Sequence, residues 1–421
     1  MPSFKFIHAA DLHLDSPLKG LAAKSASYAR RIDDASRSAF SRLIQLAIGE
    51  HCAFILIAGD LFDGQWRDYR TGLYFASQMG LLREAGIDVY IILGNHDAEN
   101  RFVSRLQLTD NVTLFPSKAP QTIRIESLNV AIHGQSFPSR DVLDNLAAKY
   151  PPPDDRCLNI GMLHTALDGR EGPALYAPCT VDQLKNHGYA YWALGHVHDY
   201  GHQLGASGAE KPYVVYSGVL QGRHIRETGP KGAVLVSVED DEIVSVEHFP
   251  LDSVRWAVVN ADVSRCTDMD SVLSTVLRGI EIEISNAGDR ALAVRVYLTG
   301  ATLLHSRLAA SGADLRELVE TAAAGFSGDV WIETITVRTT DVLQNPNGSS
   351  IDPTIAGSIR AAIEHKVAER GIRDRVAVML DDIRLKMPAG AIDDAFRDAV
   401  VAESITGARN LALAVVEKGL E

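Results

Sequence analysis

The sequence has no apolar run long enough to cross a membrane as a helix. Such a helix needs about 18 or more consecutive apolar residues, and none occurs in this chain of 421 residues. Residues 1–5 also lack the charged and apolar regions of a signal peptide. From these two absences we expect a cytoplasmic protein with no membrane partner.

Cysteine is scarce and its spacing does not suit a thiolate metal site. The four cysteines, Cys52, Cys157, Cys179 and Cys266, lie far apart, and no two have C-x-x-C spacing. Zinc ribbons and thioredoxin-like redox sites both need such closely spaced pairs. We therefore expect reduced thiols with a structural role.

Positive charge is also in short supply. The chain has 41 Lys and Arg against 54 Asp and Glu, a net charge of −13, and no basic patch stands out. A protein that binds nucleic acid by itself usually presents such a patch. Part of the negative charge is expected around a metal site, and strong DNA affinity would have to come from a partner protein.

What the chain contains is material for more than one domain. Its hydrophobic content of 46% and charged content of 23% are those of a globular protein. Its 421 residues are more than a domain with a single hydrophobic core usually contains. We predict a large domain over residues 1–250, a small β-α-β-α-β domain over 251–340, a linker over 341–352 and a helical tail over 353–421. Asp352 and Pro353 are typical of a helix start.

In the large domain, residues with metal-binding side chains repeatedly follow apolar strands. We predict strands over residues 3–10, 54–58 and 89–93, with helices over 27–49 and 69–85 between them. These strands are followed by Asp11-Leu12-His13, Gly59-Asp60 and Gly94-Asn95-His96-Asp97. Strand–helix repeats whose strands are apolar throughout predict a sheet covered by helices.

Two later strands end in histidine. Short alternating strands over 122–125 and 129–132 predict a second sheet, and strands over 158–163 and 191–194 lead to His164 and to Gly195-His196-Val197-His198. A hairpin over 213–238 and a strand near 243–246 complete the domain. Residues two apart in an extended chain point to the same side, so His196 and His198 can converge, as can Asp11 and His13.

Together the strand-end residues offer nitrogen and oxygen ligands and no thiolate. They are Asp11, His13, Asp60, Asn95, His96, His164, His196 and His198. Such a set suits Mn, Fe or Zn, and even without His96 it exceeds what one ion needs. Each motif alone is compatible with an ordinary turn, but their repetition after apolar strands favours a centre for two ions with a bridging carboxylate.

The ordered motifs D-x-H, G-D, G-N-H-D, H and G-H-x-H resemble those of the calcineurin-like metallophosphoesterases over residues 1–250. The segments FIHAADLHLDSP, GDLFD and YSGVLQGRHIRETGPKG are similar to the YhaO-like bacterial branch of the SbcD-type DNA repair exonucleases. The resemblance implies an α/β fold: a two-sheet core built as a four-layer α/β/β/α sandwich, a small α+β capping domain and a helical C-terminal tail.

The resemblance also implies a role for each ligand. One ion is held by Asp11, His13 and His198, the other by Asn95, His164 and His196, and Asp60 bridges them. Two divalent ions are implied, with Mn²⁺ expected and Fe or Zn as alternatives.

His96 is implied to be the catalytic residue that stabilises the transition state and protonates the leaving oxygen. Asp97 either orients His96 or is a turn residue. Relatives from archaea and eukaryotes carry a histidine where this chain has Asp63, so that histidine's role in positioning the phosphate does not transfer.

The only notable positive cluster near the motifs comprises Arg223, His224, Arg226 and Lys231. It is either a solvated hairpin or a contact for a nucleic-acid backbone. Among the other histidines, His8 and His133 are expected to be packing residues, and His202 is not expected to bind a third metal.

The sequence thus predicts a Mn-dependent phosphodiesterase that acts on DNA, expected to be the 3′-to-5′ exonuclease subunit of an SbcCD-like DNA repair complex. The second domain would cap the site or steer the DNA, and the tail would dock an SMC-like, SbcC-type ATPase. A homodimer is left open. Two alternatives remain: a phosphoesterase for small molecules or phosphoproteins, and a non-catalytic scaffold that tethers DNA ends beside an ATPase.

Overall fold

The computed structural model of the chain describes residues 3–18, 21, 31, 34–63, 70–99, 108–168, 176–205, 211–326, 329–341, 355–368, 370–384 and 394–418. These residues form two compact units, one comprising Met1–Trp256 with Asp289–Ala291 and the other Ala257–Gly288 with Leu292–Glu421. Apart from Asp341, the predicted linker lies outside the described residues, as does the predicted helix start at Asp352-Pro353.

The first unit contains two sheets, each of six strands. The first sheet has the order β12-β11-β1-β2-β3-β4 and the second β5-β6-β7-β8-β10-β9. The strands of the first sheet are β1 (Phe4–Ala9), β2 (Phe54–Ala58), β3 (Asp88–Ile92), β4 (Val112–Leu114), β11 (Gly232–Glu239) and β12 (Glu242–Pro250). Those of the second are β5 (Gln121–Ile125), β6 (Val130–Gly134), β7 (Leu158–His164), β8 (Tyr191–Gly195), β9 (Gly201–Leu204) and β10 (Tyr213–Tyr216).

The strands that carry the predicted ligands run parallel within their sheets. β1 is parallel to β2 and β2 to β3, while β7 is parallel to β8 in the other sheet. All residues of β2, β7 and β8 are buried, as the uniformly apolar sequence of β2 predicts. The carboxyl ends of parallel strands meet at one edge of a sheet, so the ligand motifs that follow them are gathered there.

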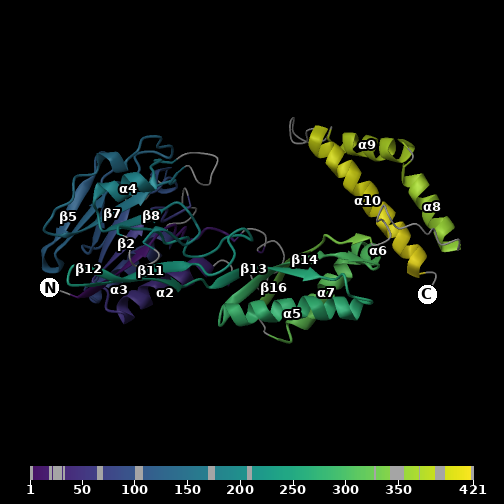
Figure 1. Cartoon of the computed structure of the whole chain (residues 1–421), viewed down its shortest axis with the longest axis horizontal. Helices are drawn as coiled ribbons and strands as arrows, with labels where there is room; N and C mark the ends of the chain where they lie inside the picture. Colours follow the sequence, from purple (N-terminus) through teal and green to yellow (C-terminus); the bar gives the residue numbers. More distant parts are fainter. Residues whose placement is uncertain are drawn as a thin grey trace. The chain divides into compact units, whose positions relative to one another are not determined.

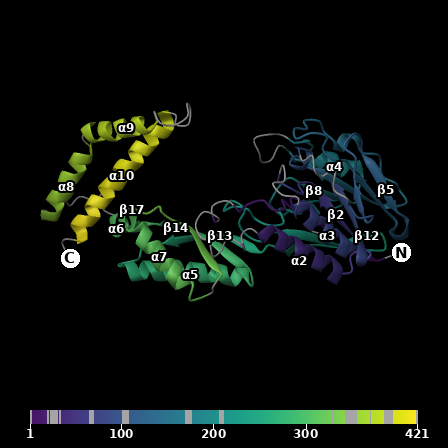
Figure 2. The same ribbon diagram turned by 180° about the vertical axis from the view of Figure 1, so that it is seen from behind.

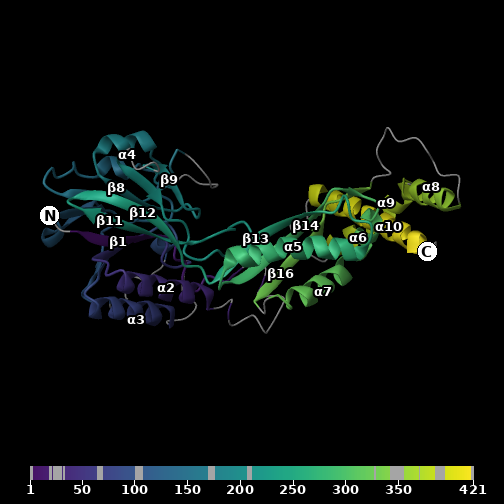
Figure 3. The ribbon, with the colours of Figure 1, turned by 60° about the horizontal axis from the view of Figure 1, so that its bottom comes forward.

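The layers of the first unit follow from which face each apolar side chain takes. Alternate side chains of the two sheets form a shared core that includes Phe6, Phe54, Ile132 and Ile160. The outer face of the first sheet packs against α2 (Ala35–Gly49) and α3 (Arg70–Glu84), and that of the second against α4 (Val181–His187). Figure 3 shows α4 on the opposite side of the strands from α2 and α3. The predicted four-layer α/β/β/α core is therefore confirmed.

The hairpin predicted over residues 213–238 is wrong. β10 lies in the second sheet, parallel to β8, whereas β11 lies in the first sheet between β1 and β12. Two apolar strand patterns joined by a loop rich in glycine resemble a hairpin locally, but hydrogen bonding to strands distant in sequence decides the sheet to which each belongs. Short 3₁₀ helices η1 (Asp97–Glu99), η3 (Glu126–Leu128) and η4 (Ala147–Lys149) complete the described elements of this unit.

The second unit has a three-stranded sheet with the order β13-β14-β16. Its elements are β13 (Val254–Asp262), whose first residues belong to the first unit, α5 (Met269–Ala287), β14 (Ala291–Thr299), β15 (Ala301–Thr302), α6 (His305–Ala310), α7 (Gly312–Ala323), β16 (Val330–Val337) and β17 (Thr340–Asp341). Helices α5 and α7 lie side by side on one face of this sheet (Figures 1 and 2). The predicted strands and longer helices are present, and α6 was not anticipated.

The C-terminal part of the second unit is helical, as predicted, and comprises α8 (Ile355–Ala368), α9 (Arg370–Arg384) and α10 (Asp394–Lys418). Ion pairs tie α10 to its neighbours, Arg397 to Asp381 at 2.8 Å and Arg409 to Glu364. Of the helices that the structure describes, none is long and apolar enough to span a membrane.

Candidate metal centre

The residues that follow five of the parallel strands lie together. Ligand atoms of Asp11, Asp60 and His164 lie within 4.8 Å of one another, and so do those of Asp11, His13 and His198. The Oδ1 atom of Asn95 lies 3.0 Å from Nε2 of His164. The ring of His196 packs against that of His164, with centroids 5.3 Å apart. All seven residues predicted as metal ligands are therefore gathered at one site.

Glycine at the start of three motifs makes this convergence possible. A Cβ on Gly195 would lie 1.9 Å from the carbonyl oxygen of Ala58, and one on Gly94 would lie 2.3 Å from Oδ1 of Asp60. A Cβ on Gly59 would lie 2.3 Å from Nδ1 of His164. Only glycine allows the strand ends to approach so closely, which gives the G-D, G-N and G-H motifs a steric basis.

Four of the candidate ligands have backbone conformations that are rare for residues with a side chain. Positive φ angles occur at Asp11 (50°), His13 (41°), Asp60 (51°) and His196 (101°). Each such residue costs on the order of 1 kcal/mol. Hydrogen bonds from the Asp11 amide to Gly59 O and from the His13 amide to Asp60 O, each 3.0 Å long, help to hold this backbone. Strain concentrated in this way is typical of functional sites.

Burial gives the imidazoles of three candidate ligands the neutral state that metal binding requires. The imidazoles of His13, His164 and His196 are neutral, because burial lowers the pKa of His13 and of His164 and lowers that of His196 to about 3. The two carboxylates, Asp11 and Asp60, are 0% and 2% exposed. Burial, and next the charge of Asp60, raise the pKa of Asp11, so a bound cation would relieve the repulsion between them.

The hydrogen-bonding pattern shows that the residues fit divalent cations. Nδ1 of His164 lies 3.0 Å from the carbonyl oxygen of Ala58 and must carry the ring hydrogen, because a carbonyl only accepts. Its Nε2 therefore presents a lone pair toward Oδ1 of Asn95, which is 3.0 Å away and also has only lone pairs. A cation bound by both atoms would satisfy both lone pairs.

His96 lies beside this centre and is held by Asp63. Nδ1 of His96 is 2.9 Å from Oδ1 of Asp63, and Ser16 donates to the other carboxylate oxygen at 2.9 Å. The hydrogen bond with Asp63 raises the pKa of His96, and the same bond lowers the pKa of Asp63. The side chain of His96 is 35% exposed and its Nε2 lies 4.0 Å from Asp60. A partly exposed imidazole with a raised pKa suits a proton donor.

Asp97 serves the loop around the centre. Its carboxylate accepts hydrogen bonds from the backbone amides of Leu61 and Phe62 at 3.0 Å and of Gly94 at 3.1 Å. These bonds join the loops that follow β2 and β3. Of the two roles considered for Asp97, the contacts support the turn role, and Asp63 is the residue that orients His96.

The predicted positive cluster is divided by the structure. Arg223 lies at the centre, with Nη1 3.7 Å from Oδ2 of Asp63 and with its Nε buried and unpaired within the described residues. Lys231 is buried and paired with Asp199, and Arg226 is exposed.

Sequence reasoning missed Glu227, whose Oε1 atom lies 2.7 Å from Nδ1 of His198. Glu227 lies in the loop between β10 and β11, outside every ligand motif. The only signal for it was the segment YSGVLQGRHIRETGPKG, which contains it.

Three histidines outside the centre, His8, His133 and His202, make contacts with other residues. His8 is buried, with one ring nitrogen 3.0 Å from the hydroxyl of Tyr191 and the other 3.1 Å from the carbonyl oxygen of Leu194. His133 lies between Thr122 and Asn159. His202 is hydrogen-bonded to the hydroxyl of Tyr200 at 2.7 Å.

Two protein families match the chain. Residues 4–200 match the family described as calcineurin-like phosphoesterase. Residues 256–340 match the family described as metallophosphoesterase YhaO, middle domain.

Individual proteins are also similar to this chain. It is 39% identical over 274 residues to "Uncharacterized metallophosphoesterase YhaO" of Bacillus subtilis (strain 168), an alignment that covers 64% of this chain and 66% of that protein. It is 26% identical over 227 residues to the DNA double-strand break repair protein Mre11 of Methanopyrus kandleri, which covers 50% of this chain and 48% of the relative. The chain thus spans between about half and two thirds of these relatives.

Among solved structures, the chain is similar to a dimetal phosphatase from Danio rerio. The TM-score is 0.36 at 14% identity, and the match covers 57% of this chain and 94% of the other. We infer nothing further from that likeness.

Proposed function

We propose that the protein, whose residues 4–200 match the calcineurin-like phosphoesterase family, is a dimetal-dependent phosphodiesterase that acts on DNA as a 3′-to-5′ exonuclease. The observation that carries the metal-dependent chemistry is the 3.0 Å approach of Asn95 Oδ1 and His164 Nε2. Two lone-pair atoms at this distance, beside the buried carboxylates of Asp11 and Asp60, form a site built for cations.

Two groups of residues would hold the ions. The His198 group comprises Asp11, His13 and His198, and the Asn95 group comprises Asn95, His164 and His196, with Asp60 between them. Two divalent ions bound there would supply the positive charge that stabilises the transition state of phosphate-ester cleavage and would acidify a water. We propose Mn²⁺ as the native ion.

His96 donates a proton to the oxygen that leaves phosphorus. Asp63 keeps the hydrogen on Nδ1 of His96 and, by the 2.9 Å contact, fixes the plane of the ring. Protonation of the leaving alkoxide by such an imidazole contributes about 10²–10⁴-fold to the rate. The guanidinium of Arg223, whose Nη1 lies 3.7 Å from Oδ2 of Asp63 beside His96, is the proposed donor to a nonbridging phosphate oxygen.

DNA is the proposed substrate because several relatives, the Methanopyrus protein among them, are named as double-strand break repair proteins. The net charge of −13 disfavours strong binding of DNA by the chain alone. We propose that the second domain caps the site and that helices α8–α10 dock an SMC-like, SbcC-type ATPase, which supplies the remaining DNA affinity.

The test is digestion of end-labelled duplex DNA in the presence of Mn²⁺, with a chromogenic phosphodiester assayed in parallel. We expect shortening from the 3′ end and loss of about 100-fold or more of the rate in His96→Asn, with the Mn²⁺ content retained. His51→Asn is the matched control, because His51 is an exposed histidine that follows α2.

The other two assignments predict different results. Hydrolysis of the chromogenic diester without cleavage of DNA would support a phosphoesterase for small molecules or phosphoproteins. Failure to hydrolyse either substrate, with both ions bound, would support a non-catalytic scaffold. Equal activity in His96→Asn and the unmutated protein would show that His96 is not the proton donor.

A further inference from the structure

We propose that Glu227 positions the metal ligand His198 and thereby makes the His198 group the tighter of the two ion-binding groups. This inference rests on the proposed function, since it assumes that both groups bind ions. Glu227 lies outside the ligand motifs, in the loop formed by residues 222–229.

The contact between Glu227 and His198 fixes which ring nitrogen faces the centre. Oε1 of Glu227 lies 2.7 Å from Nδ1 of His198, so Nδ1 donates its hydrogen to the carboxylate. Nε2 of His198 is then left with a lone pair. That atom lies 3.9 Å from Oδ1 of Asp11 and 3.4 Å from Nε2 of His13, which places it among the other ligands of its group.

Glu227 is itself held in place. Its side chain is 6% exposed, and its second carboxylate oxygen accepts a 2.6 Å hydrogen bond from the backbone amide of Arg223. The side chains of Arg223 and His224 lie 3.7 and 3.4 Å from Oε1. The contact with His198 is the shortest that Glu227 makes to a side chain, so the carboxylate is directed mainly at that ring.

The loop that carries Glu227 is closed by Trp256. The indole Nε1 of Trp256 donates to the carbonyl oxygen of Gly222 at 2.9 Å, and the amide of Gly229 donates to the carbonyl oxygen of Trp256 at 3.0 Å. A Cβ on Gly222 would lie 2.8 Å from the carbonyl oxygen of Glu227. Trp256 is 1% exposed. The loop is therefore a packed element that can hold a side chain in one orientation.

The two ion-binding groups differ in what stands behind their histidines. His198 is backed by a carboxylate, whereas His164 of the Asn95 group is backed by the neutral carbonyl oxygen of Ala58 at 3.0 Å. A carboxylate partner makes an imidazole a more basic ligand and brings a negative charge toward the cation. Removal of such a partner typically weakens metal binding about 10–100-fold. The His198 group should therefore bind its ion more tightly.

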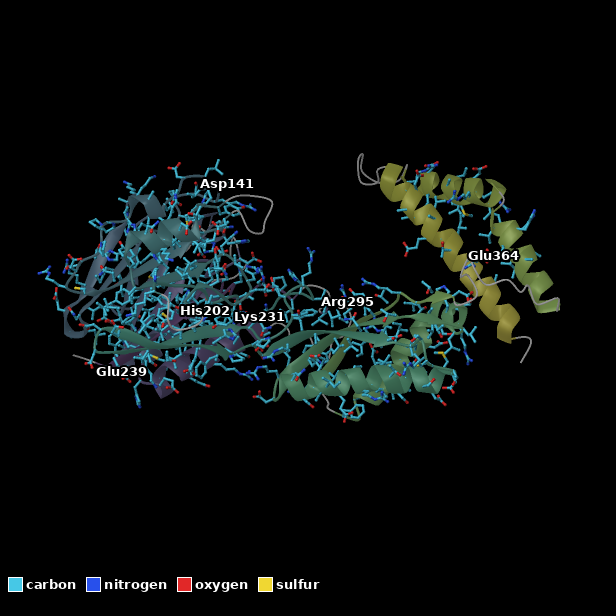
Figure 4. The ribbon with its side chains drawn as sticks, viewed as in Figure 1. Asp141, His202, Lys231, Glu239, Arg295 and Glu364 are labelled. Carbon is cyan, nitrogen blue, oxygen red and sulfur yellow. The ribbon has the colours of Figure 1, made fainter. Side chains whose placement is uncertain are left out.

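The experiment compares Glu227→Gln with the unmutated protein in a Mn²⁺ titration. Binding is measured by calorimetry and by the electron paramagnetic resonance signal of free Mn²⁺. Glutamine can still accept from His198 but carries no charge. We expect one of two sites to weaken about 10–100-fold and the other to be unchanged. Glu239→Gln is the control, because Glu239 is exposed and lies far from the centre along β11. The other end of β11 is marked by Lys231, which pairs with Asp199, the residue next to His198 (Figure 4).

Two further variants identify the weakened site and exclude a general loss of structure. In a His13→Ala background, which removes the His198 group, Glu227→Gln should cause no further change at the remaining site. Glu227→Asp keeps the charge and should recover part of the lost affinity. Thermal melting of the metal-free variants should match that of the unmutated protein.

Three results would overturn the inference: unchanged affinity at both sites in Glu227→Gln, equal weakening of both, or no recovery in Glu227→Asp. Failure of the unmutated protein to bind two ions would instead contradict the proposed function.

Discussion

At the scale of single residues, the centre depends on how each imidazole is oriented. His164 is fixed by a backbone carbonyl, His198 by Glu227 and His96 by Asp63. Each partner leaves the other ring nitrogen free for its proposed role, which is to present a lone pair to a cation in the first two and to protonate the leaving oxygen in the third.

We predict that Asp63→Asn lowers kcat about 10-fold or more while the protein still binds two ions, because the proton donor is less well oriented. Asp63 raises the pKa of His96 through their hydrogen bond. In the variant that pKa falls, so the alkaline limb of the pH–kcat profile should move to lower pH. A profile that coincides with that of the unmutated protein would contradict this role. Asp141→Asn, at an exposed loop residue (Figure 4), is the control.

These residue-level pairings could not be predicted from the sequence. The sequence pointed to Asp63 only as a position at which relatives carry a histidine. Asp97 was the expected partner of His96 because the two residues are adjacent in the sequence. Which carboxylate contacts His96 depends on the path of the loops after β2 and β3, where Asp97 accepts hydrogen bonds from three backbone amides. The convergence of the candidate ligands could be predicted, because each lies at or within a few residues of the end of an apolar strand.

At the scale of elements, the position of the centre depends on the ends of strands from the two sheets, which approach one another with no side chain between them. Gly195 at the end of β8 lies against Ala58 at the end of β2, so the two sheets meet there at backbone distance. The apolar sequence of β2 predicted the strand and the glycine motifs predicted its end. The sheet to which β10 and β11 belong could not be predicted, since strand pairing is decided by residues far apart in the sequence.

We predict that Gly195→Ala destabilises the protein by about 1–3 kcal/mol or more, because its methyl group would overlap the carbonyl oxygen of Ala58. It should also weaken metal binding by displacing His196. Gly80→Ala is the matched control: Gly80 lies within α3, where a Cβ meets nothing within 4 Å, and the change should stabilise the protein by up to about 1 kcal/mol. Urea unfolding of both variants measures the difference, and equal effects would contradict the close approach.

The free energy of unfolding should also depend on pH through His8, a buried residue of β1. Burial lowers the pKa of His8 to about 3, from the 6.5 expected in an unfolded chain. The unfolded state therefore binds the proton more readily, so the stabilisation is present above pH 6.5 and is lost progressively as the pH falls toward 3. Between pH 7 and pH 5 this amounts to about 2 kcal/mol.

We predict that His8→Phe, measured without metal, loses less stability than the unmutated protein between pH 7 and pH 5, by roughly that amount. The variant should be less stable at pH 7, because the hydroxyl of Tyr191 and the carbonyl of Leu194 lose a partner. Free energies of unfolding at the two pH values test this. If both proteins lost the same stability, the buried neutral state of His8 would be disproved.

At the scale of the whole molecule, the chain combines a unit that contains the candidate metal centre with a second unit whose sequence has no ligand motif. The predicted small domain and helical tail correspond to the elements β13–β17 and α8–α10. Their proposed roles, capping the site and docking an ATPase, do not follow from the fold. The acidic charge of −13 also fits a chain whose central site is neutralised by cations.

The most direct test of the account is the number of Mn²⁺ ions bound per chain, measured by equilibrium dialysis. The gathered candidate ligands predict two ions for the unmutated protein and weaker binding of at least one in Asp60→Asn, which removes the carboxylate proposed to bridge them. Asp141→Asn should bind as the unmutated protein does. A chain that binds fewer than two ions at saturation, or an Asp60→Asn variant that binds both with undiminished affinity, would contradict the account.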